Sequence, residues 1–366
     1  MQEVIGTAIA LYLLTNKKLP LYGGVLITIV DTFTFLFLDK YGLRKLEAFF
    51  AFLIAVMAIT FGYEYFAIMP DQVELVKGLV IPGCGECNTA IFLQSIGMIG
   101  ALITPHNLYL HSSLVKTRKV DRKNIAEVKD ANRYYFIESA VALLVSLIIN
   151  IFVLAVFAAG MSGKTNNYVV DLCTEKGINV SDIFQDNDNI ISGDIYRGGV
   201  FLGCEFGSLY MYIWAIGLIA SGQSSTMTGT YTGQFVMEGF LNMKWKRWKR
   251  VLVTRTLAIL PTIMVALLQD VNSMSGMNDY INALMAVQLP FALLTTFMFT
   301  ASKALMKEFA NDLKNNIFMG TMTIFLIGLN IYFAINFVSA YLPHTWPVHL
   351  CLSVIFIFYV LGLGYL

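Results

Sequence analysis

The stretch ALITPHNLYLHSS, residues 101–113, places a proline, two histidines and an asparagine inside a strongly apolar run. Pro105 has no backbone N–H, and its ring clashes with the preceding helical turn, so a helix through this run is interrupted there. In hydrocarbon, the carbonyl groups that lose their helical partners must find other partners or line a cavity. The carbonyls of residues 101–104 can therefore face a bound cation. A proline kink packed against a neighbouring helix is the simpler alternative.

The two histidines add ionisable groups to this apolar run, where such groups are costly and usually functional. His106 and His111 are five residues apart, or roughly 140° around a regular helix, so they do not share a face as a zinc-binding pair four residues apart does. We expect one near the ion site and the other along a proton route, because histidine titrates near neutral pH. The sequence contains no HExxH motif and no paired catalytic carboxylates, which indicates that the protein is not an enzyme.

The composition is that of an integral membrane protein, since 57% of the 366 residues are hydrophobic and only 13% are charged. The formal net charge of +1 gives no indication of nucleic-acid binding. The apolar runs are continuous and show no strand-like alternation, which predicts an all-α protein with about ten transmembrane helices. The predicted spans are residues 19–38, 47–69, 89–115, 135–161, 200–226, 251–269, 281–301, 317–342 and 348–366, after a shorter run at 4–15.

The loops predict an orientation. Of the 25 Lys and Arg residues, 18 lie in four loops that share one side if the spans alternate, and the positive-inside rule assigns that side to the cytoplasm. The loop at 162–199 then faces away from the cytoplasm. It is acidic and contains an N-glycosylation sequon at Asn179, although a single sequon also arises by chance. The four basic loops are residues 40–45, 116–133, 244–250 and 303–314.

Four cysteines lie on the side opposite the basic loops, where an oxidising environment allows disulfide bonds. Cys84 and Cys87 form a CxxC pair, whereas Cys173 and Cys204 are widely separated. Zinc is the alternative for a CxxC pair, but the second two cysteines lack the spacing of a zinc site. We therefore expect disulfide bonds, and the spacing leaves their pairing open.

Three stretches together resemble one family. Residues 100–118, GALITPHNLYLHSSLVKTR, resemble the sixth transmembrane helix of the NRAMP family of proton-coupled divalent metal transporters. Residues 222–240, GQSSTMTGTYTGQFVMEGF, resemble the transport signature of that family between its eighth and ninth helices. Residues 276–294, GMNDYINALMAVQLPFALL, resemble its tenth helix. The resemblance extends over essentially the whole chain, and within the family the chain resembles the animal transporters of iron and manganese uptake.

This resemblance implies a single transmembrane domain over residues 1–366 with a LeuT-like fold of inverted repeats. It further implies proton-coupled symport of divalent metal ions such as Fe²⁺ and Mn²⁺, with no resident cofactor. The metal ligands it implies are the carbonyl of Ala101, the side chain of Thr104 and, as a further contributor, Gln288. The partners are then divalent metal ions, protons and the lipid bilayer, with no nucleic acid. The expected location is the plasma membrane or an endosomal or lysosomal membrane.

The resemblance also assigns a proton-linked network to Glu3, His106 and His111. Arg255 is the one basic residue within a predicted span, and it is interpreted as a counter-charge at the proton exit. The alternative is an arginine that reaches water from near the cytoplasmic end of its helix. Glu138 also lies in an apolar run, and we expect it to form structural hydrogen bonds between helices rather than to relay protons.

Two departures from the family pattern lead to further expectations. The family carries Asp-Pro-Gly-Asn in its first helix, but no Asp-Pro-Gly occurs here, and the chain aligns from the third helix onward. The expectation is therefore an N-terminally incomplete, truncated form with roughly half of the metal ligands, which binds and transports metal weakly. Thr104 replaces the usual Met, and because a hydroxyl is a harder ligand than a thioether, we expect weaker discrimination against calcium and magnesium.

Two alternatives belong to other functional classes. The first is a transport-inactive membrane protein that associates with and modulates a full-length transporter, as the expected loss of two helices suggests. The second is a sodium-coupled carrier of organic solutes with the same fold class, which the three family-like stretches disfavour.

Overall fold

The computed structural model describes most of the chain, and within the described residues the regular secondary structure is helical, apart from an isolated antiparallel bridge between Thr165 and Ile190. The chain forms two compact units, one of Met1–Gly83 with Ser113–Ser275 and one of Cys84–Ser112 with Gly276–Leu366. The described residues are 2–28, 43–81, 89–177, 180, 183–184, 187–191, 193–239, 241–242, 245–268, 271–341 and 346–365.

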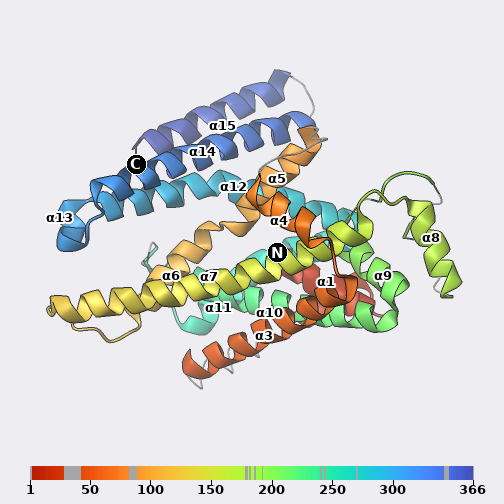
Figure 1. The fold of residues 1–366 in the computed structure, drawn as a ribbon. Coiled ribbons are helices and arrows are strands. Elements are labelled where there is room, and N and C mark those ends of the chain that lie inside the picture. Colours follow the sequence, from red (N-terminus) through yellow and green to blue (C-terminus); the bar gives the residue numbers. More distant parts are fainter. Residues whose placement is uncertain are drawn as a thin grey trace. The chain divides into compact units, whose positions relative to one another are not determined.

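The first unit is organised around the long helix α10, which contacts α1, α3, α9 and α11. Residues 21–28 are also helical. Ile5 and Ile9 of α1 and Met227 of α10 are among its fully buried side chains. The helices of this unit are α1 (Gln2–Leu14), α3 (Leu43–Ile68), α4 (Gln72–Val80), α7 (Ile125–Met161), α8 (Asn166–Glu175), α9 (Ile195–Phe206), α10 (Ser208–Gly239) and α11 (Arg247–Leu268) (Figure 1).

Small residues allow α1 to pack closely in this unit. A Cβ atom at Gly222 of α10 would overlap the hydroxyl of Thr7 and would lie 3.1 Å from the carbonyl oxygen of Glu3. A Cβ atom at Gly24 would lie 2.9 Å from the Cα atom of Ala8. In membranes, where water does not drive helices together, such close backbone approach is a main source of helix–helix stability. Glycine at positions 24 and 222 therefore determines how closely the neighbouring segments approach α1.

The predicted continuous span at 200–226 is wrong in one respect, because the structure divides it into α9 and α10 at Gly207. Gly207 has a φ angle of 107°, in the left-handed region that residues with a Cβ atom rarely adopt. Its N–H still donates to the carbonyl of Gly203, at 3.0 Å, so the last turn of α9 is closed before the chain turns. Glu205 and Ser208 lie close to this position, but the run as a whole is apolar, so its overall hydrophobicity did not indicate the interruption.

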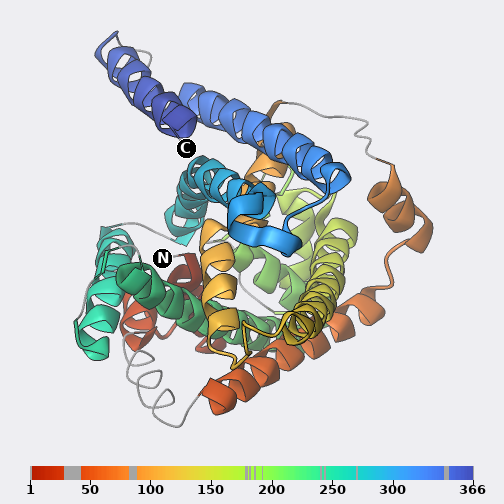
Figure 2. The same cartoon turned by 90° about the vertical axis from the view of Figure 1, so that its left-hand side faces the viewer.

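The second unit contains the interrupted helix and the C-terminal helices, and Figure 2 shows α13 at the turn between α12 and α14. Ile96, Ala283, Ala286 and Phe333 form its buried core cluster. Its helices are α5 (Thr89–Leu102), the first part of α6 (Pro105–Lys116), α12 (Val271–Ala301) from Gly276 onward, α13 (Lys303–Met306), the 3₁₀ turn η1 (Lys307–Phe309), α14 (Leu313–Tyr341) and α15 (Trp346–Tyr365).

Helix α15 attaches to α12 through one tyrosine. The hydroxyl of Tyr359 donates a hydrogen bond to the carbonyl oxygen of Val287, at 3.0 Å. The rings of Tyr359 and Phe291 meet edge to face, with centroids 5.2 Å apart. A polar and an aromatic contact from the same side chain thus fix α15 against the middle of α12.

The prediction of an all-helical membrane protein is confirmed. Four helices of the described chain are long and apolar enough to cross a bilayer, through residues Ala51–Ile68, Ile125–Met161, Ile281–Ala301 and Leu313–Asn336. Shorter apolar helices occur at Gln2–Leu14 and Leu352–Tyr365. Large apolar side chains such as Phe136 and Leu143 of α7 are exposed, as expected for a helix that faces lipid.

Candidate metal site and proton-linked residues

The interruption predicted at Pro105 is present, and it separates α5 from α6 (Figure 1). The last bond of α5 runs from the N–H of Ile103 to the carbonyl of Ile99, at 2.9 Å. Pro105 is the first residue of α6, where the missing N–H is tolerated because the first helical N–H groups have no partner within the helix. The N–H of Asn107 donates to the carbonyl of Thr104, at 3.2 Å, and closes the first turn of α6. Pro105 therefore starts a new helix as well as ending the old one.

This arrangement leaves two oxygen atoms close together in sequence without their usual partners. In a regular helix the carbonyl of Ala101 would accept from the N–H of residue 105, which proline lacks. The side chain of Thr104 is buried, and its hydroxyl has no hydrogen-bond partner in the part of the chain that the structure describes. A buried polar group without a partner costs about 1–3 kcal/mol, so a cation that binds this hydroxyl would recover that free energy.

Helix α12 approaches the interruption closely. A Cβ atom at Gly100 would lie 2.9 Å from the Cβ atom of Ala286, so the two backbones meet one residue before Ala101. The carbonyl of Ala286 also lacks its regular helical donor, because Pro290 lies four residues later. Sequence reasoning did not identify this carbonyl, although Pro290 was the signal for it. The third predicted ligand, Gln288, is exposed and lies on a different face of α12 from the buried Ala286.

The two histidines differ in their environments. His106 lies in the first turn of α6 and is half-buried, whereas His111 is exposed. Among the described residues, no group of three or more His, Cys, Asp or Glu side chains is placed to hold a metal ion. The atoms available to bind a metal ion at the interruption are therefore backbone and hydroxyl oxygens, and the histidines lie beside them.

Glu3 and Arg255, the other residues assigned to proton movement, lie in the first unit. Glu3 is half-buried in the first turn of α1, and its carboxyl accepts a hydrogen bond from the hydroxyl of Ser225 in α10. Arg255 of α11 is 5% exposed. A guanidinium group that reached water along its helix would be more exposed than this, so the burial of Arg255 argues against that alternative.

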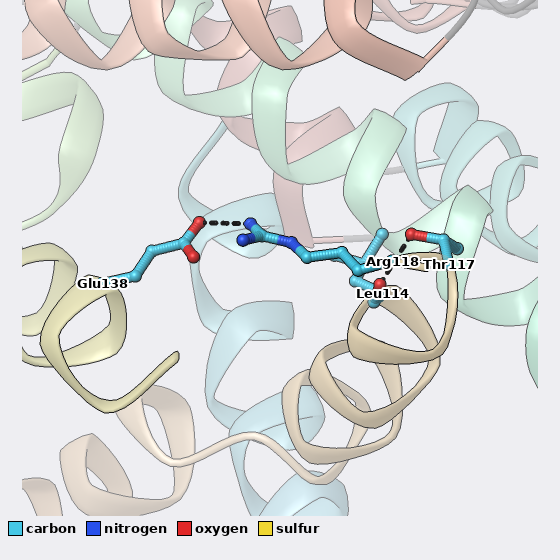
Figure 3. Close-up of polar contacts among 4 residues, drawn as sticks. All are labelled: Leu114, Thr117, Arg118 and Glu138. Atoms are coloured by element: carbon cyan, nitrogen blue, oxygen red, sulfur yellow. Dashed lines mark hydrogen bonds and ion pairs between the residues drawn. The ribbon is translucent and has the colours of Figure 1, made fainter. Parts of the chain in front are cut away.

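Glu138 has a different partner from the one expected. Figure 3 shows the Glu138 carboxylate accepting a hydrogen bond from Nη2 of Arg118, at 2.8 Å, in the connection after α6. The guanidinium also lies 5.3 Å from the ring centroid of Tyr135. The two side chains are 50% and 58% exposed, so this ion pair contributes at most about 1 kcal/mol. Glu138 thus binds the connecting segment rather than a neighbouring helix.

One of the expected disulfide bonds joins the segment predicted as the loop 162–199 to the helix at its end. Cys173 of α8 is bonded to Cys204 of α9, with Cα atoms 4.8 Å apart, and both cysteines are fully buried. This bond fixes the pairing that the sequence left open. Cys84, Cys87 and the sequon at Asn179 lie outside the described residues. The loop predicted at 162–199 therefore includes helical segments held by a covalent bond.

The fold and the interruption define a class of protein: a multi-pass helical membrane protein in which one helix is broken at a carbonyl and a hydroxyl oxygen without helical hydrogen-bond partners. Residues 1–336 match the family model described as "Natural resistance-associated macrophage protein-like". The chain belongs to this NRAMP family.

Individual relatives agree with this assignment. The chain is 58% identical over 340 residues to Protein Malvolio of Drosophila melanogaster, covering 92% of this chain and 57% of that protein. It is 53% identical over 367 residues to human Natural resistance-associated macrophage protein 2, covering 100% of this chain and 64% of that protein. The chain thus spans about three fifths of the length of these relatives.

The fold also matches a solved structure. A crystal structure of the Eremococcus coleocola manganese transporter, in complex with an aromatic bis-isothiourea substituted compound, superimposes with a TM-score of 0.77 at 30% identity. The match covers 99% of this chain and 74% of that transporter. The chain therefore has the LeuT-like fold of NRAMP transporters.

Proposed function

We propose that the protein containing these residues transports divalent transition-metal ions, such as Mn²⁺ and Fe²⁺, across a membrane together with protons. The observation that carries this proposal is the buried Thr104 hydroxyl, which has no hydrogen-bond partner among the described residues and lies three residues from the donor-deprived carbonyl of Ala101. Membership of the NRAMP family and the similarity to a manganese transporter support the choice of ion.

The proposed site binds its ion through oxygen atoms at the helix interruption. The carbonyl of Ala101 and the hydroxyl of Thr104 each contribute a ligand that no helix hydrogen bond occupies. Gln288 supplies a further carbonyl group when α12 turns its exposed face toward the ion. Because these ligands lie on separate helical segments, movement of either segment changes the coordination, which is the basis of alternating access.

Proton movement is assigned to residues beside the site and in the first unit. His106 is next to the interruption and His111 lies further along α6, so the two can exchange protons at different points of a transport cycle. Glu3 and the buried Arg255 form the remaining proton-linked groups of the proposal. The expected membranes are the plasma membrane or those of endosomes and lysosomes.

The experiment is uptake of Mn²⁺ by proteoliposomes that carry the whole protein containing these residues, with and without an inward proton gradient. Wild type is compared with Thr104→Val, which removes only the hydroxyl, and with Thr117→Val, which removes an exposed hydroxyl bonded to the carbonyl of Leu114. We expect gradient-stimulated uptake in wild type and Thr117→Val and a large loss in Thr104→Val. Equal uptake by wild type and Thr104→Val would contradict the assigned site, and absence of Mn²⁺ uptake by wild type would contradict the function.

A further inference from the structure

The first unit contains a buried carboxyl group that the proposed mechanism does not use. Glu64 of α3 is 1% exposed, and its Oε1 atom has no hydrogen-bond partner in the part of the chain that the structure describes. Intramembrane carboxyl groups are rare and costly, and they usually have a function. The sequence gives little indication of this group, because Glu64 is an isolated acidic residue within the aromatic and apolar residues 48–68 of α3.

Glu64 lies in the contact between α3 and α10. A Cβ atom at Gly217 of α10 would lie 3.0 Å from the Thr60 hydroxyl and 3.1 Å from the Phe61 ring, so these two residues face α10. Glu64 is four residues after Thr60 and three after Phe61, and therefore lies on the same face of α3. The Phe61 and Trp214 rings are also in contact, with centroids 5.2 Å apart. The carboxyl group is thus enclosed between the two helices.

A pair of tyrosines lies beside this carboxyl group. The rings of Tyr63 and Tyr210 stack with centroids 5.6 Å apart, and their hydroxyl oxygens are 3.5 Å apart. Tyr210 is close enough to Glu64 for an electrostatic interaction. Tyr63 is 50% exposed, so the pair connects the enclosed carboxyl group to the surface of the unit.

In residues 208–237 of α10 and 139–161 of α7, the described stretches of the helices packed against α3, no cation is available to neutralise a charge on Glu64. The helices packed against α3 are α10 and α7. Residues 208–237 of α10 contain no charged residue. The titratable side chains at the start of this helix, near Glu64, are the tyrosines Tyr210 and Tyr212. Residues 139–161 of α7 contain no titratable side chain, and this helix meets α3 through Phe152. An enclosed carboxylate without a cation would lose its hydration without a compensating electrostatic interaction, whereas the neutral acid avoids that free-energy cost.

We infer that Glu64 is a proton-binding residue of this protein, which carries its proton in the enclosed state and releases it when the contact between α3 and α10 opens. This inference rests on the proposed proton-coupled transport for its place in a cycle. It adds a proton-binding group separate from Glu3, His106 and His111. When the contact between α3 and α10 opens, water reaches the carboxyl group beside the Tyr63–Tyr210 pair.

The first experiment measures the proton directly and needs no transport. Infrared difference spectra of purified wild-type protein against Glu64→Gln, in lipid nanodiscs at neutral pH, report the C=O band of a protonated carboxylic acid. Glu138→Gln is the control, because Glu138 is exposed and paired with Arg118. We expect the band to be lost in Glu64→Gln and retained in Glu138→Gln. Identical carboxylic-acid bands in wild type and Glu64→Gln would overturn the inference.

The second experiment measures the release of the proton. Mn²⁺ uptake is compared at several external pH values for wild type, Glu64→Gln and Glu138→Gln, with thermal unfolding used to confirm that each variant is folded. Glutamine mimics the protonated acid permanently, so we expect Glu64→Gln to lose the stimulation of uptake by external acid. An unchanged pH profile would overturn the role in proton movement. If wild type shows no uptake, the proposed function fails, while the infrared result still decides whether Glu64 binds a proton.

Discussion

Thr104 combines two properties that rarely occur together in a membrane protein, a hydroxyl group within a helix interruption and burial without a hydrogen-bond partner among the described residues. A hydroxyl is a hard ligand, which suits manganese, calcium and magnesium alike, whereas the thioether usual in the family favours softer transition metals. Selectivity therefore depends on this side chain more directly than on the neighbouring carbonyl of Ala101, which every residue type provides.

The corresponding prediction is that Thr104→Met increases discrimination against calcium. We expect the ratio of Mn²⁺ to Ca²⁺ uptake to rise about tenfold, equivalent to about 1.4 kcal/mol. The measurement is competition of Ca²⁺ with Mn²⁺ uptake in proteoliposomes. Equal exclusion of calcium by wild type and Thr104→Met would show that other ligands determine selectivity.

At the scale of helices, the packing of α1 on α10 depends on a glycine that leaves no room for a side chain. Gly222 faces the Thr7 hydroxyl and the carbonyl of Glu3, the residue assigned to proton movement. Pushing α1 away at this point would also disturb the hydrogen bond between Ser225 and the Glu3 carboxyl. Helix packing and the position of a functional side chain are thus linked through one residue.

We predict that Gly222→Ala destabilises the protein by about 1–3 kcal/mol, because the added methyl group overpacks the contact with α1. Gly229→Ala is the matched control on the same helix, since a Cβ atom at Gly229 would have no neighbour within 4 Å. Alanine in an open helical position stabilises by roughly 0.5–1 kcal/mol relative to glycine. Thermal unfolding in detergent should therefore shift in opposite directions for the two variants. A similar shift for both would contradict the close contact.

The disulfide bond is the covalent link between α8 and α9. Removing it with Cys204→Ser should destabilise the segment of α8 and α9 by about 2–4 kcal/mol, because the unfolded chain regains the freedom that the bond removes. Thermal unfolding with and without a reducing agent measures this effect. The reductant should lower the melting temperature of wild type and leave that of Cys204→Ser unchanged. A reductant effect of equal size in both proteins would show that this bond is not responsible.

Some helical features were predictable and others were not, for physical reasons. The interruption at Pro105 was predictable because the effect of proline on a helix is local. The turn at Gly207 was not, because a glycine in an apolar run is also compatible with a continuous helix. The helices inside the predicted loop at 162–199 depend on tertiary contacts and on the Cys173–Cys204 bond. The pairing of Arg118 with Glu138 joins residues 20 positions apart, which sequence spacing does not reveal.

At the scale of the whole molecule, α7 shows how the chain extends beyond the bilayer. Its 37 residues correspond to about 55 Å of helix, whereas the hydrocarbon core is roughly 30 Å thick. Its polar first turns, up to residue 133, belong to the most basic of the predicted cytoplasmic loops, residues 116–133. Its last residue, Met161, precedes the segment with the disulfide bond. The two ends of α7 therefore belong to opposite sides of the membrane in the predicted orientation.

This orientation leads to a labelling prediction. A cysteine introduced at Lys119, in the basic connection before α7, should be inaccessible to a membrane-impermeant maleimide applied to intact cells. A cysteine introduced at Ser162, directly after α7, should react, and both positions are exposed. The unsubstituted protein gives the background from native cysteines, and permeabilised cells confirm that position 119 can react. Labelling of position 119 alone in intact cells would show that the orientation is the reverse of the predicted one.

The bond between Cys173 and Cys204 also distinguishes newly synthesised chains from mature ones. Its two cysteines are 31 residues apart, on separate helices, so it cannot form until Cys204 of α9 has been synthesised and both cysteines have entered an oxidising compartment. Newly made and matured chains should therefore separate on a non-reducing gel, even though their sequences are identical. In a pulse-labelled cell, the appearance of the faster-migrating form would time the arrival of the outer segment on its final side of the membrane.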